Sequence, residues 1–333
     1  MLQTGIVGCG GIAQVHAHAL TRLDGVTAAA FADVKPERAA DFAARFGGRA
    51  FASLEEMLAG CRLDAVHICT PHYLHFPMIK ACLDKGLYVF SEKPPVMTEA
   101  ELAGLCAISG RERVGFSFQN RWNGNFTAVR AILEKGELGA VTGVKGMLTW
   151  HRTAPYYTES GWRGSPLTEG GGVVINQAIH TLDLMVQLLG MPKAISATTA
   201  NRHLQGIIEV EDTAEAYLDY GDKAALFYAT TAYSTDSPVM IEITCEGGSL
   251  RMVGDALEIR TAEGLESHSF TCDDAVGKAY WGTGHGKCIF DFYRAINEGT
   301  VFPCNADSIV PTMKVMFGLY ASAAAGGKRV ELG

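Results

Sequence analysis

The stretch Gly5-Ile6-Val7-Gly8-Cys9-Gly10-Gly11-Ile12-Ala13 decides the fold of the N-terminal part of the chain. A short apolar strand runs into a G-x-G-x-x-A turn, and a helical pattern continues from the turn to Leu20. The first glycine permits a tight turn, the second lets a pyrophosphate approach the backbone, and the third small residue lets the helix pack on the strand. The N-terminus of the helix then faces the phosphates. We therefore predict dinucleotide contacts from Gly8, Gly10, Gly11, Ile12 and Ala13.

The next strand indicates which dinucleotide this turn binds. The apolar run Val26 to Ala32 ends at Asp33, where an acidic residue is expected to accept the hydroxyls of the adenosine ribose. A carboxylate there favours a free 2'-hydroxyl over a 2'-phosphate, which indicates NAD. Lys35 lies close enough to offset this preference, so NADP stays open as a second cofactor.

Strands and helices continue to alternate as far as residue 120. The strands end near positions 8, 33, 70, 93 and 119. Because the carboxyl ends of parallel strands meet at one edge of a doubly wound sheet, we expect the residues there to contact the cofactor. Beyond the glycine turn and Asp33, they are Thr70, Pro71, His75, Glu92, Lys93 and Gln119.

Lys93 is the candidate for chemistry among these residues. The segment Glu92-Lys93-Pro94-Pro95 directly follows the apolar run 87–90, which is typical of a buried parallel strand. A lysine at such a strand end is expected to point into a crevice, although a surface lysine is the alternative. The Lys93–Pro94 bond is open to a cis geometry, but trans is the general expectation.

Composition limits the class of protein. The length of 333 residues predicts two domains, which we place at 1–120 and 121–333. A net charge of -8 without a long basic run argues against nucleic acid or an anionic membrane as partner. We find no secretory signal and no membrane-spanning apolar stretch, and the nine cysteines are scattered without metal-ligand spacing. We therefore expect a cytoplasmic protein with reduced cysteines and no metal site.

The second half of the chain has a different pattern. Beyond Trp122 strands dominate, and several alternate apolar with polar residues, which is typical of an antiparallel sheet with one open face. Such a face is a natural surface for a homodimer. The predicted fold class is therefore α/β, with an N-terminal Rossmann doubly wound parallel sheet and a C-terminal α/β domain built on a large, mostly antiparallel sheet.

One helix in this half carries polar residues. The triple glycine Gly170–Gly172 opens a helical pattern that continues to Leu189. Asn176, His180 and Asp183 stand at i, i+4 and i+7, which puts them on one face of a regular helix. A polar stripe on an otherwise apolar helix needs a partner or a cleft. A histidine there is a candidate base or a satisfied core residue, and both interpretations stay open.

Four segments together resemble the Gfo/Idh/MocA superfamily of oxidoreductases: the turn Gly8–Ala13, Cys69-Thr70-Pro71 with His75, Glu92-Lys93-Pro94 and the helix within Gly170–Asp183. The resemblance implies NAD(P)-dependent oxidation or reduction of a sugar, glycoside or cyclitol, and a homodimer or homotetramer formed through the C-terminal sheet. It also implies catalytic roles for Lys93 and His180. The family's aspartate four positions before that histidine is Asn176 here, which leaves open whether His180 or Lys93 is the principal acid/base.

Aromatic and basic residues just before this helix are candidates for binding the substrate. Aromatic rings stack on the apolar faces of sugars, while arginine and histidine bind hydroxyls or carboxylates. A loop that merely caps the fold is an equally good interpretation of this segment. Further residues join them: the Arg121-Trp122 pair, Asp183 on the helix and the glycine-flanked His285. The full set of substrate candidates is Arg121, Trp122, Arg152, Tyr156, Trp162, Arg163, Asp183 and His285.

Two other functions remain as alternatives. An NAD-dependent glycosidase would oxidise C3 of a glycoside transiently, eliminate the aglycone and reduce the product again. A non-catalytic dinucleotide sensor would use the same fold, although the presence of both Lys93 and His180 argues against it.

Overall fold

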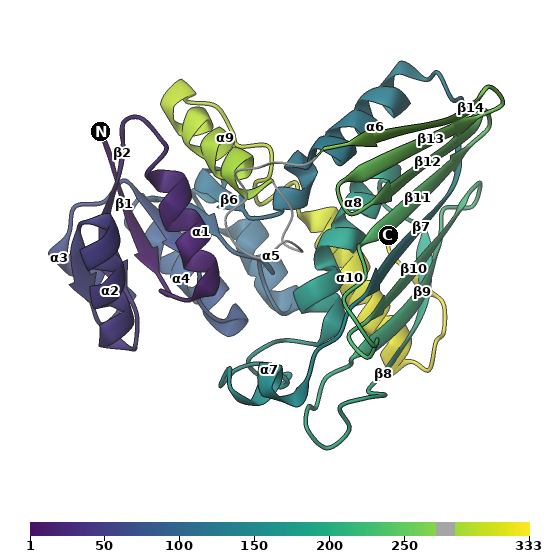
Figure 1. Cartoon of the computed structure of the whole chain (residues 1–333). Helices are drawn as coiled ribbons and strands as arrows, with labels where there is room; N and C mark the ends of the chain where they lie inside the picture. The colour runs from purple at the N-terminus through teal and green to yellow at the C-terminus, as the bar shows by residue number, and fades with distance from the viewer. Residues whose placement is uncertain (271–283) are drawn as a thin grey trace. The chain divides into compact units, whose positions relative to one another are not determined.

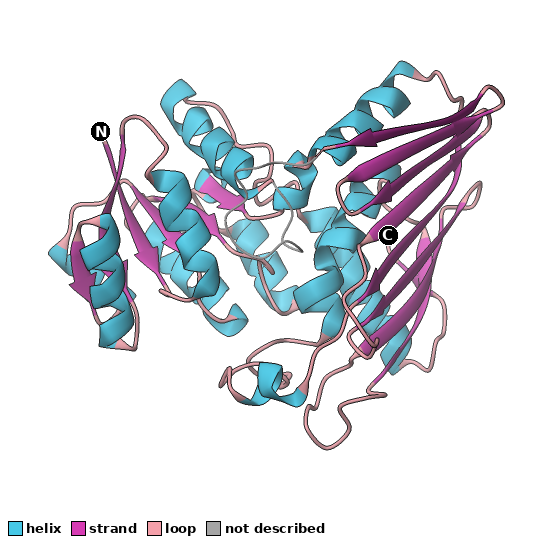
Figure 2. Cartoon of the chain, viewed as in Figure 1, coloured by secondary structure: helices cyan, strands magenta, loops and turns pink. Residues whose placement is uncertain are grey.

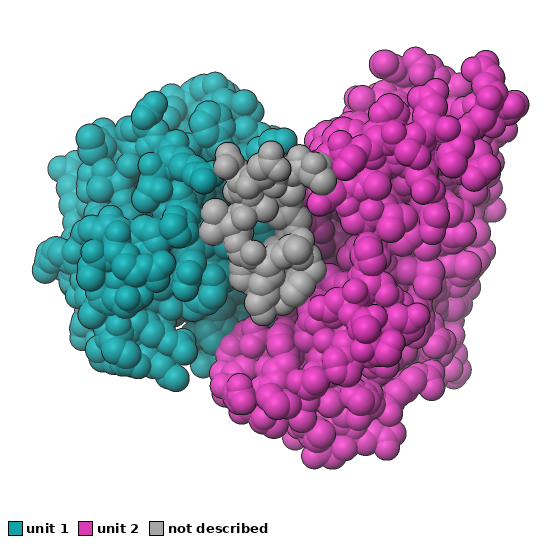
Figure 3. Space-filling view, viewed as in Figure 1, with its two compact units in different colours: residues 1–119, 274–309 teal, residues 120–273, 310–333 magenta. Residues whose placement is uncertain are grey.

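The computed structural model describes residues 1–270 and 284–333, which form two compact units (Figure 3). Of these residues, the first unit contains 1–119 and 284–309, and the second contains 120–270 and 310–333. This division differs in one respect from the two continuous segments expected from the sequence: segment 284–309 packs with the N-terminal unit. The local pattern of a helix does not reveal the sheet on which it packs.

The first unit is built on a six-stranded parallel sheet in the order β3-β2-β1-β4-β5-β6 (Figure 1). The strands are β1 (Leu2–Val7), β2 (Val26–Ala32), β3 (Arg49–Phe51), β4 (Ala65–Ile68), β5 (Tyr88–Ser91) and β6 (Val114–Phe116). The helices are α1 (Gly11–Leu20), α2 (Pro36–Phe46), α3 (Leu54–Gly60), α4 (His75–Leu83), α5 (Glu99–Ala107) and α9 (His285–Glu298), of which α9 packs beside α1 (Figure 1). The strand order reverses between β1 and β4, which confirms the predicted doubly wound sheet.

The second unit is built on a nine-stranded sheet in the order β14-β13-β12-β11-β7-β10-β9-β8-β15. The strands are β7 (Val141–Thr149), β8 (Ala194–Ala200), β9 (Thr213–Asp219), β10 (Ala224–Thr230), β11 (Met240–Cys245), β12 (Gly248–Val253), β13 (Ala256–Thr261), β14 (Gly264–Ser269) and β15 (Val330–Glu331). All neighbours are antiparallel except β7 and β10. The prediction of a large, mostly antiparallel sheet is therefore confirmed.

Helices cover one face of this large sheet (Figure 2). They are α6 (Gly124–Lys135), α8 (Ile179–Leu189) and α10 (Val310–Ala324), while the short α7 (Ala154–Thr158) lies in the segment before α8. Alternation along β7 buries Val144 and Leu148, whereas Met147 between them is exposed. No helix among the residues described here is both long and apolar enough to cross a bilayer.

Candidate active site

The glycine turn has the geometry that its sequence predicts. Gly8 has φ 86°, and a Cβ built on it would lie 2.6 Å from the carbonyl oxygen of Cys69, so a larger residue does not fit. Gly10 caps the N-terminus of α1, and a Cβ there would meet no described atom within 4 Å. An open, positively polarised helix end behind a tight turn fits a pyrophosphate.

Asp33 lies beside this turn at the end of β2. Its Oδ2 accepts a hydrogen bond from the backbone N–H of Cys9 at 2.7 Å, and its Oδ1 accepts one from Lys35 at 2.8 Å. The carboxylate is therefore fixed against the dinucleotide turn. Since each carboxylate oxygen has a second acceptor site, Asp33 can still bind ribose hydroxyls.

A buried chain of polar side chains ends at Glu92. The Nε2 of His16 lies 3.0 Å from Oε1 of Glu92, and its Nδ1 lies 2.9 Å from Nδ1 of His67. Tyr293 follows, with its hydroxyl 2.9 Å from Nε2 of His67 and 2.8 Å from Oγ1 of Thr4. With a neutral His16, one set of tautomers satisfies all four contacts, and every proton is then donated in the direction of Glu92.

This chain keeps Glu92 ionised. Burial alone would raise the pKa of the Glu92 carboxyl, but the hydrogen bond from His16 and the electrostatic effects of the nearby His16, His285 and Lys93 side chains outweigh it and hold the pKa well below its usual range. The desolvation of His67 lowers the pKa of its imidazole, which keeps that ring neutral. A carboxylate thus stands next to Lys93 in the chain.

The turn that carries Lys93 is braced from below. The Lys93–Pro94 bond is cis, so the general expectation of trans is wrong here. His75 is fully buried, with Nδ1 2.7 Å from the carbonyl oxygen of Pro94 and Nε2 2.9 Å from that of Thr70. Both ring nitrogens therefore contact the backbone of the turns after β4 and β5, which makes His75 a link between two predicted cofactor-binding segments.

His285 begins α9 within the first unit and is buried. Its desolvation lowers its pKa to about 4, although the charge of Glu92 acts in the opposite direction. Gln119 is also buried, in a short turn (Gln119–Trp122) beyond β6. His285, which the sequence predicts as a substrate residue, thus interacts electrostatically with Glu92, as Lys93 also does.

In the second unit, the helix with the polar stripe is not regular. Val174–Ala178 form a π-helical turn, and α8 begins only at Ile179. The prediction of one regular helix is wrong here, because the wider turn changes the spacing between Asn176 and His180. Asn176 and Asp183 are buried, whereas His180 is partly exposed. Such π-helical turns often occur at functional sites.

Two buried carboxylates hold the start of this helix. Glu211 accepts hydrogen bonds from the backbone N–H groups of Gly172 at 2.9 Å and Val174 at 3.1 Å. Glu169 accepts one from Nδ2 of Asn176 at 2.5 Å. The sequence pattern identified neither glutamate, because only the fold brings Glu211 to Gly172, which lies 39 residues earlier in the chain.

Arg121 and Asp183, both predicted to bind the substrate, bind one another within the second unit. The guanidinium donates from Nε to Oδ2 at 2.8 Å and from Nη2 to Oδ1 at 2.6 Å. The hydroxyl of Thr312 in α10 donates to Oδ1 at 2.7 Å. This bidentate ion pair and the bond from Thr312 connect α8 to the segments beside it. Both residues therefore have protein partners that stabilise the fold.

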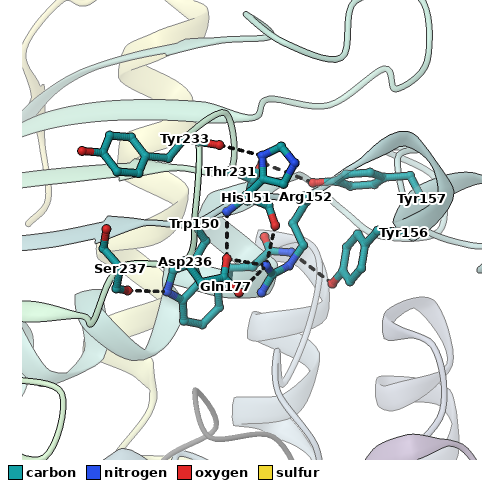
Figure 4. A network of polar contacts seen from close by, with 10 residues as sticks. All are labelled: Trp150, His151, Arg152, Tyr156, Tyr157, Gln177, Thr231, Tyr233, Asp236 and Ser237. Atoms are coloured by element: carbon teal, nitrogen blue, oxygen red, sulfur yellow. Dashed lines mark hydrogen bonds and ion pairs between the residues drawn. The ribbon is translucent and has the colours of Figure 1, made fainter.

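Before the helix, Trp150, Arg152 and Tyr156 lie together in one cluster (Figure 4). The guanidinium of Arg152 lies 5.4 Å from the centroid of the Tyr156 ring, and that of Arg163 lies 4.5 Å from it. The hydroxyl of Tyr156 accepts a hydrogen bond from Gln177 in the π-helical turn, which links the cluster to the helix (Figure 4). Arg152 is buried and paired with Asp236 at 2.8 Å.

Trp162 and Arg163 are more accessible than Arg152, since both are partly exposed. The Arg163 guanidinium lies 4.5 Å from the Trp162 ring centroid, so these two side chains stack. Tyr157 packs in a small core with Leu204 and Ile208, and Tyr156 packs against this core. Of this segment, Tyr156, Trp162 and Arg163 are partly exposed.

Comparison with known protein families agrees with this geometry. Residues 2–117 match the family described as "Oxidoreductase family, NAD-binding Rossmann fold", and residues 126–251 match the "GFO/IDH/MocA C-terminal domain". The chain belongs to the Gfo/Idh/MocA family. The resemblance noted in the sequence is confirmed, and NAD is the cofactor of the first unit.

Individual relatives are more distant. The chain is 30% identical over 197 residues to an inositol 2-dehydrogenase from Leifsonia xyli subsp. xyli, a match that covers 58% of this chain and 55% of that protein. A solved structure of the WlbA dehydrogenase from Bordetella pertussis, in complex with NADH and UDP-GlcNAcA, is 27% identical with a TM-score of 0.89 and covers 100% of this chain and 98% of that one. A levoglucosan dehydrogenase complex at 20% identity and a TM-score of 0.88, covering 99% of each chain, shows the shared fold.

Proposed function

We propose that this Gfo/Idh/MocA protein is a dehydrogenase that transfers a hydride between NAD and a secondary hydroxyl or keto group of a sugar, glycoside or cyclitol. The observation that carries the proposal is the ionised, buried Glu92 directly before Lys93, at the strand edge that also holds the dinucleotide turn. Inositol in the name of the Leifsonia relative and UDP-GlcNAcA in the Bordetella structure support this substrate class.

Residues of the first unit hold the cofactor in this proposal. NAD, when bound, supplies the hydride acceptor. The open N-terminus of α1 binds the pyrophosphate through the turn Gly8–Ala13, and Asp33 binds the adenosine ribose and disfavours the 2'-phosphate of NADP. The remaining contacts come from the strand-end residues Thr70, Pro71, Glu92, Lys93 and Gln119, with His75 positioning two of these turns.

The chemistry at the substrate oxygen is assigned to His180 and Lys93. Oxidation of an alcohol requires removal of the hydroxyl proton, and a histidine is suited to accept it near neutral pH. We assign the acceptance of this proton to the partly exposed His180. The ammonium group of Lys93 stabilises the negative charge that develops on the substrate oxygen. Asn176 orients the reacting groups by hydrogen bonding.

The substrate candidates divide into two groups under this proposal. Tyr156, Trp162 and Arg163 form the stacking surface for a sugar ring, to which we add Trp122. Four others are placed in supporting roles, since their charged or aromatic groups have protein partners or lie beside Glu92: Arg121, Arg152, Asp183 and His285.

We further propose that the protein is a cytoplasmic homodimer or homotetramer. Support for the oligomer comes from the open face of the nine-stranded sheet, which exposes Met147, Tyr217 and Leu226. Tyr217 and Leu226 are cross-strand partners on β9 and β10, so they form a continuous apolar patch.

A screen of sugars, glycosides and inositols for NADH and NADPH formation tests the function. We expect NADH formation with at least one substrate, and a decrease in kcat of roughly 10²- to 10⁴-fold for both Lys93→Ala and His180→Ala. If no alcohol reduces either cofactor and no keto-sugar oxidises NADH or NADPH, the proposal is wrong. Release of an aglycone without net NADH would instead identify the glycosidase.

A further inference from the structure

Glu169 is a buried carboxylate that the proposed chemistry does not yet use. Its side chain has no solvent exposure. One carboxylate oxygen, Oε2, accepts a hydrogen bond from the backbone N–H of Gly164 at 2.5 Å, and the other, Oε1, accepts one from Nδ2 of Asn176 at 2.5 Å. Glu169 therefore joins the segment with Trp162 and Arg163 to the π-helical turn that contains Asn176.

The contact fixes the orientation of the Asn176 amide. An amide has a donor end and an acceptor end, and an ionised carboxylate can only accept. With one N–H of Nδ2 donated to Glu169, the carbonyl oxygen Oδ1 points away from that carboxylate and is the acceptor end of Asn176. A protonated Glu169 could instead donate to Oδ1, which would reverse the amide. The protonation of Glu169 and the orientation of Asn176 are thus coupled.

The surroundings of Glu169 allow its carboxyl group to change protonation near neutral pH. Burial raises the pKa of Glu169 to about 7, and the hydrogen bonds from Gly164 and Asn176 and the charge of Arg163 offset only part of the effect. The charge of Glu211 acts in the same direction as burial. The phenols of Tyr157 and Tyr320 also interact electrostatically with Glu169.

We propose that Glu169 is a positioning residue for the dehydrogenase reaction: through its hydrogen bond it sets which end of the Asn176 amide faces the reacting groups. This inference rests on the proposed function, in which Asn176 orients those groups. It also accounts for the asparagine at position 176, where the family resemblance implies an aspartate. The carboxylate is instead that of Glu169, which is hydrogen-bonded to Asn176.

Two variants separate charge from structure. In Glu169→Gln, the new amide can still accept from Gly164 and can donate to a reversed Asn176, so both hydrogen bonds are retained while the charge is lost. In the double variant Glu169→Gln/Asn176→Asp, the glutamine introduced at position 169 donates to the aspartate introduced at position 176, so the charge returns to the pair. The exposed Glu209, which accepts from Ser165 in the same region, provides the control variant Glu209→Gln.

The measurement is the pH profile of kcat between pH 5 and 9 with the substrate found by the screen. We expect Glu169→Gln to lower kcat roughly 10- to 100-fold and to alter the limb of the profile near pH 7, to which Glu169 contributes. The double variant should recover about tenfold or more of the loss, and Glu209→Gln should match the natural protein. A Glu169→Gln profile of unchanged shape, or a double variant no more active than Glu169→Gln, would overturn the proposal.

A second readout does not need turnover. Because the pKa of Glu169 is higher in the folded than in the unfolded chain, its protonation stabilises the fold fully below the unfolded value of 4.5, and this contribution is lost as the pH rises through 7. The Tm of Glu169→Gln should therefore fall less than that of the natural protein between pH 5 and 8. Parallel Tm curves would contradict the titration of Glu169, whereas a natural protein that oxidises no substrate would contradict only the proposed function.

Discussion

Glu92 is the side chain whose charge matters most to the proposed chemistry. Replacement by glutamine keeps its size but removes the charge that faces Lys93, so the ammonium loses a stabilising partner. We expect Glu92→Gln to lower kcat/KM roughly 10- to 100-fold, or about 1.4 to 3 kcal/mol, and to move the alkaline limb of the pH profile to lower pH. Steady-state kinetics across pH measure both effects. Glu99→Gln, at an exposed position in the first turn of α5, should change neither; an unaltered profile for Glu92→Gln would refute the role of its charge.

Asp33 tests the choice of cofactor at a single position. Asp33→Asn removes the negative charge that repels a 2'-phosphate, while one side-chain oxygen remains to accept from Cys9. The ratio of kcat/KM with NAD to kcat/KM with NADP should fall about tenfold or more. The same ratio for Asp24→Asn, on an exposed turn before β2, should stay at the natural value. Equal ratios in both variants would assign the preference to other residues.

Side chains with a local signature could be predicted from the sequence, and side chains with distant partners could not. The spacing of Gly8, Gly10 and Asp33 repeats what the backbone of a dinucleotide turn requires, so their places follow from the pattern alone. Glu169 and Glu211 carry no such pattern. Both are buried carboxylates, and a buried carboxylate needs hydrogen-bond donors. Only the folded chain shows which groups donate to them.

The π-helical turn before α8 depends on a close approach of two backbone segments. A Cβ on Gly172 would lie 1.8 Å from the carbonyl oxygen of Glu211, and a backbone atom cannot move aside as a side-chain tip can. We expect Gly172→Ala to lower the free energy of unfolding by roughly 2 to 4 kcal/mol, measured by denaturant titration. Gly286→Ala, in the first turn of α9 with no described atom within 4 Å of the added methyl group, should be close to neutral. Equal stability of the two variants would contradict the close approach.

Most elements could be predicted because their apolar residues repeat with the period of a helix or strand, and the exceptions lack that signal. Every residue of β14 is exposed, and two of the three residues of β3 are exposed, so neither shows an apolar face. The π-helical turn Val174–Ala178 is entirely buried, so its composition does not distinguish it from a regular helix. Element type thus follows from burial patterns, while hydrogen-bond register does not.

The assignment of 284–309 to the first unit is a property of the chain as a whole. Tyr293 of α9 completes the hydrogen-bonded chain that ends at Glu92, so a segment near the C-terminus contributes to the polar chain beside Lys93. A truncated chain that ends after residue 120 would lack this tyrosine. The first unit is therefore formed by both parts of the sequence, which a division by length alone does not reveal.

The open face of the nine-stranded sheet leads to the last prediction. Leu226 is 56% exposed and Tyr217 is 43% exposed, and cross-strand apolar pairs of this kind are usually covered by a partner. A glutamate at position 226 would bury a charge in such an interface, so Leu226→Glu should shift the protein from a dimer or tetramer to a monomer in sedimentation velocity experiments. Val301→Glu alters an equally exposed apolar residue of the first unit and should leave the mass unchanged. A natural protein that sediments as a single chain at micromolar concentration would show that this face has no second copy as its partner.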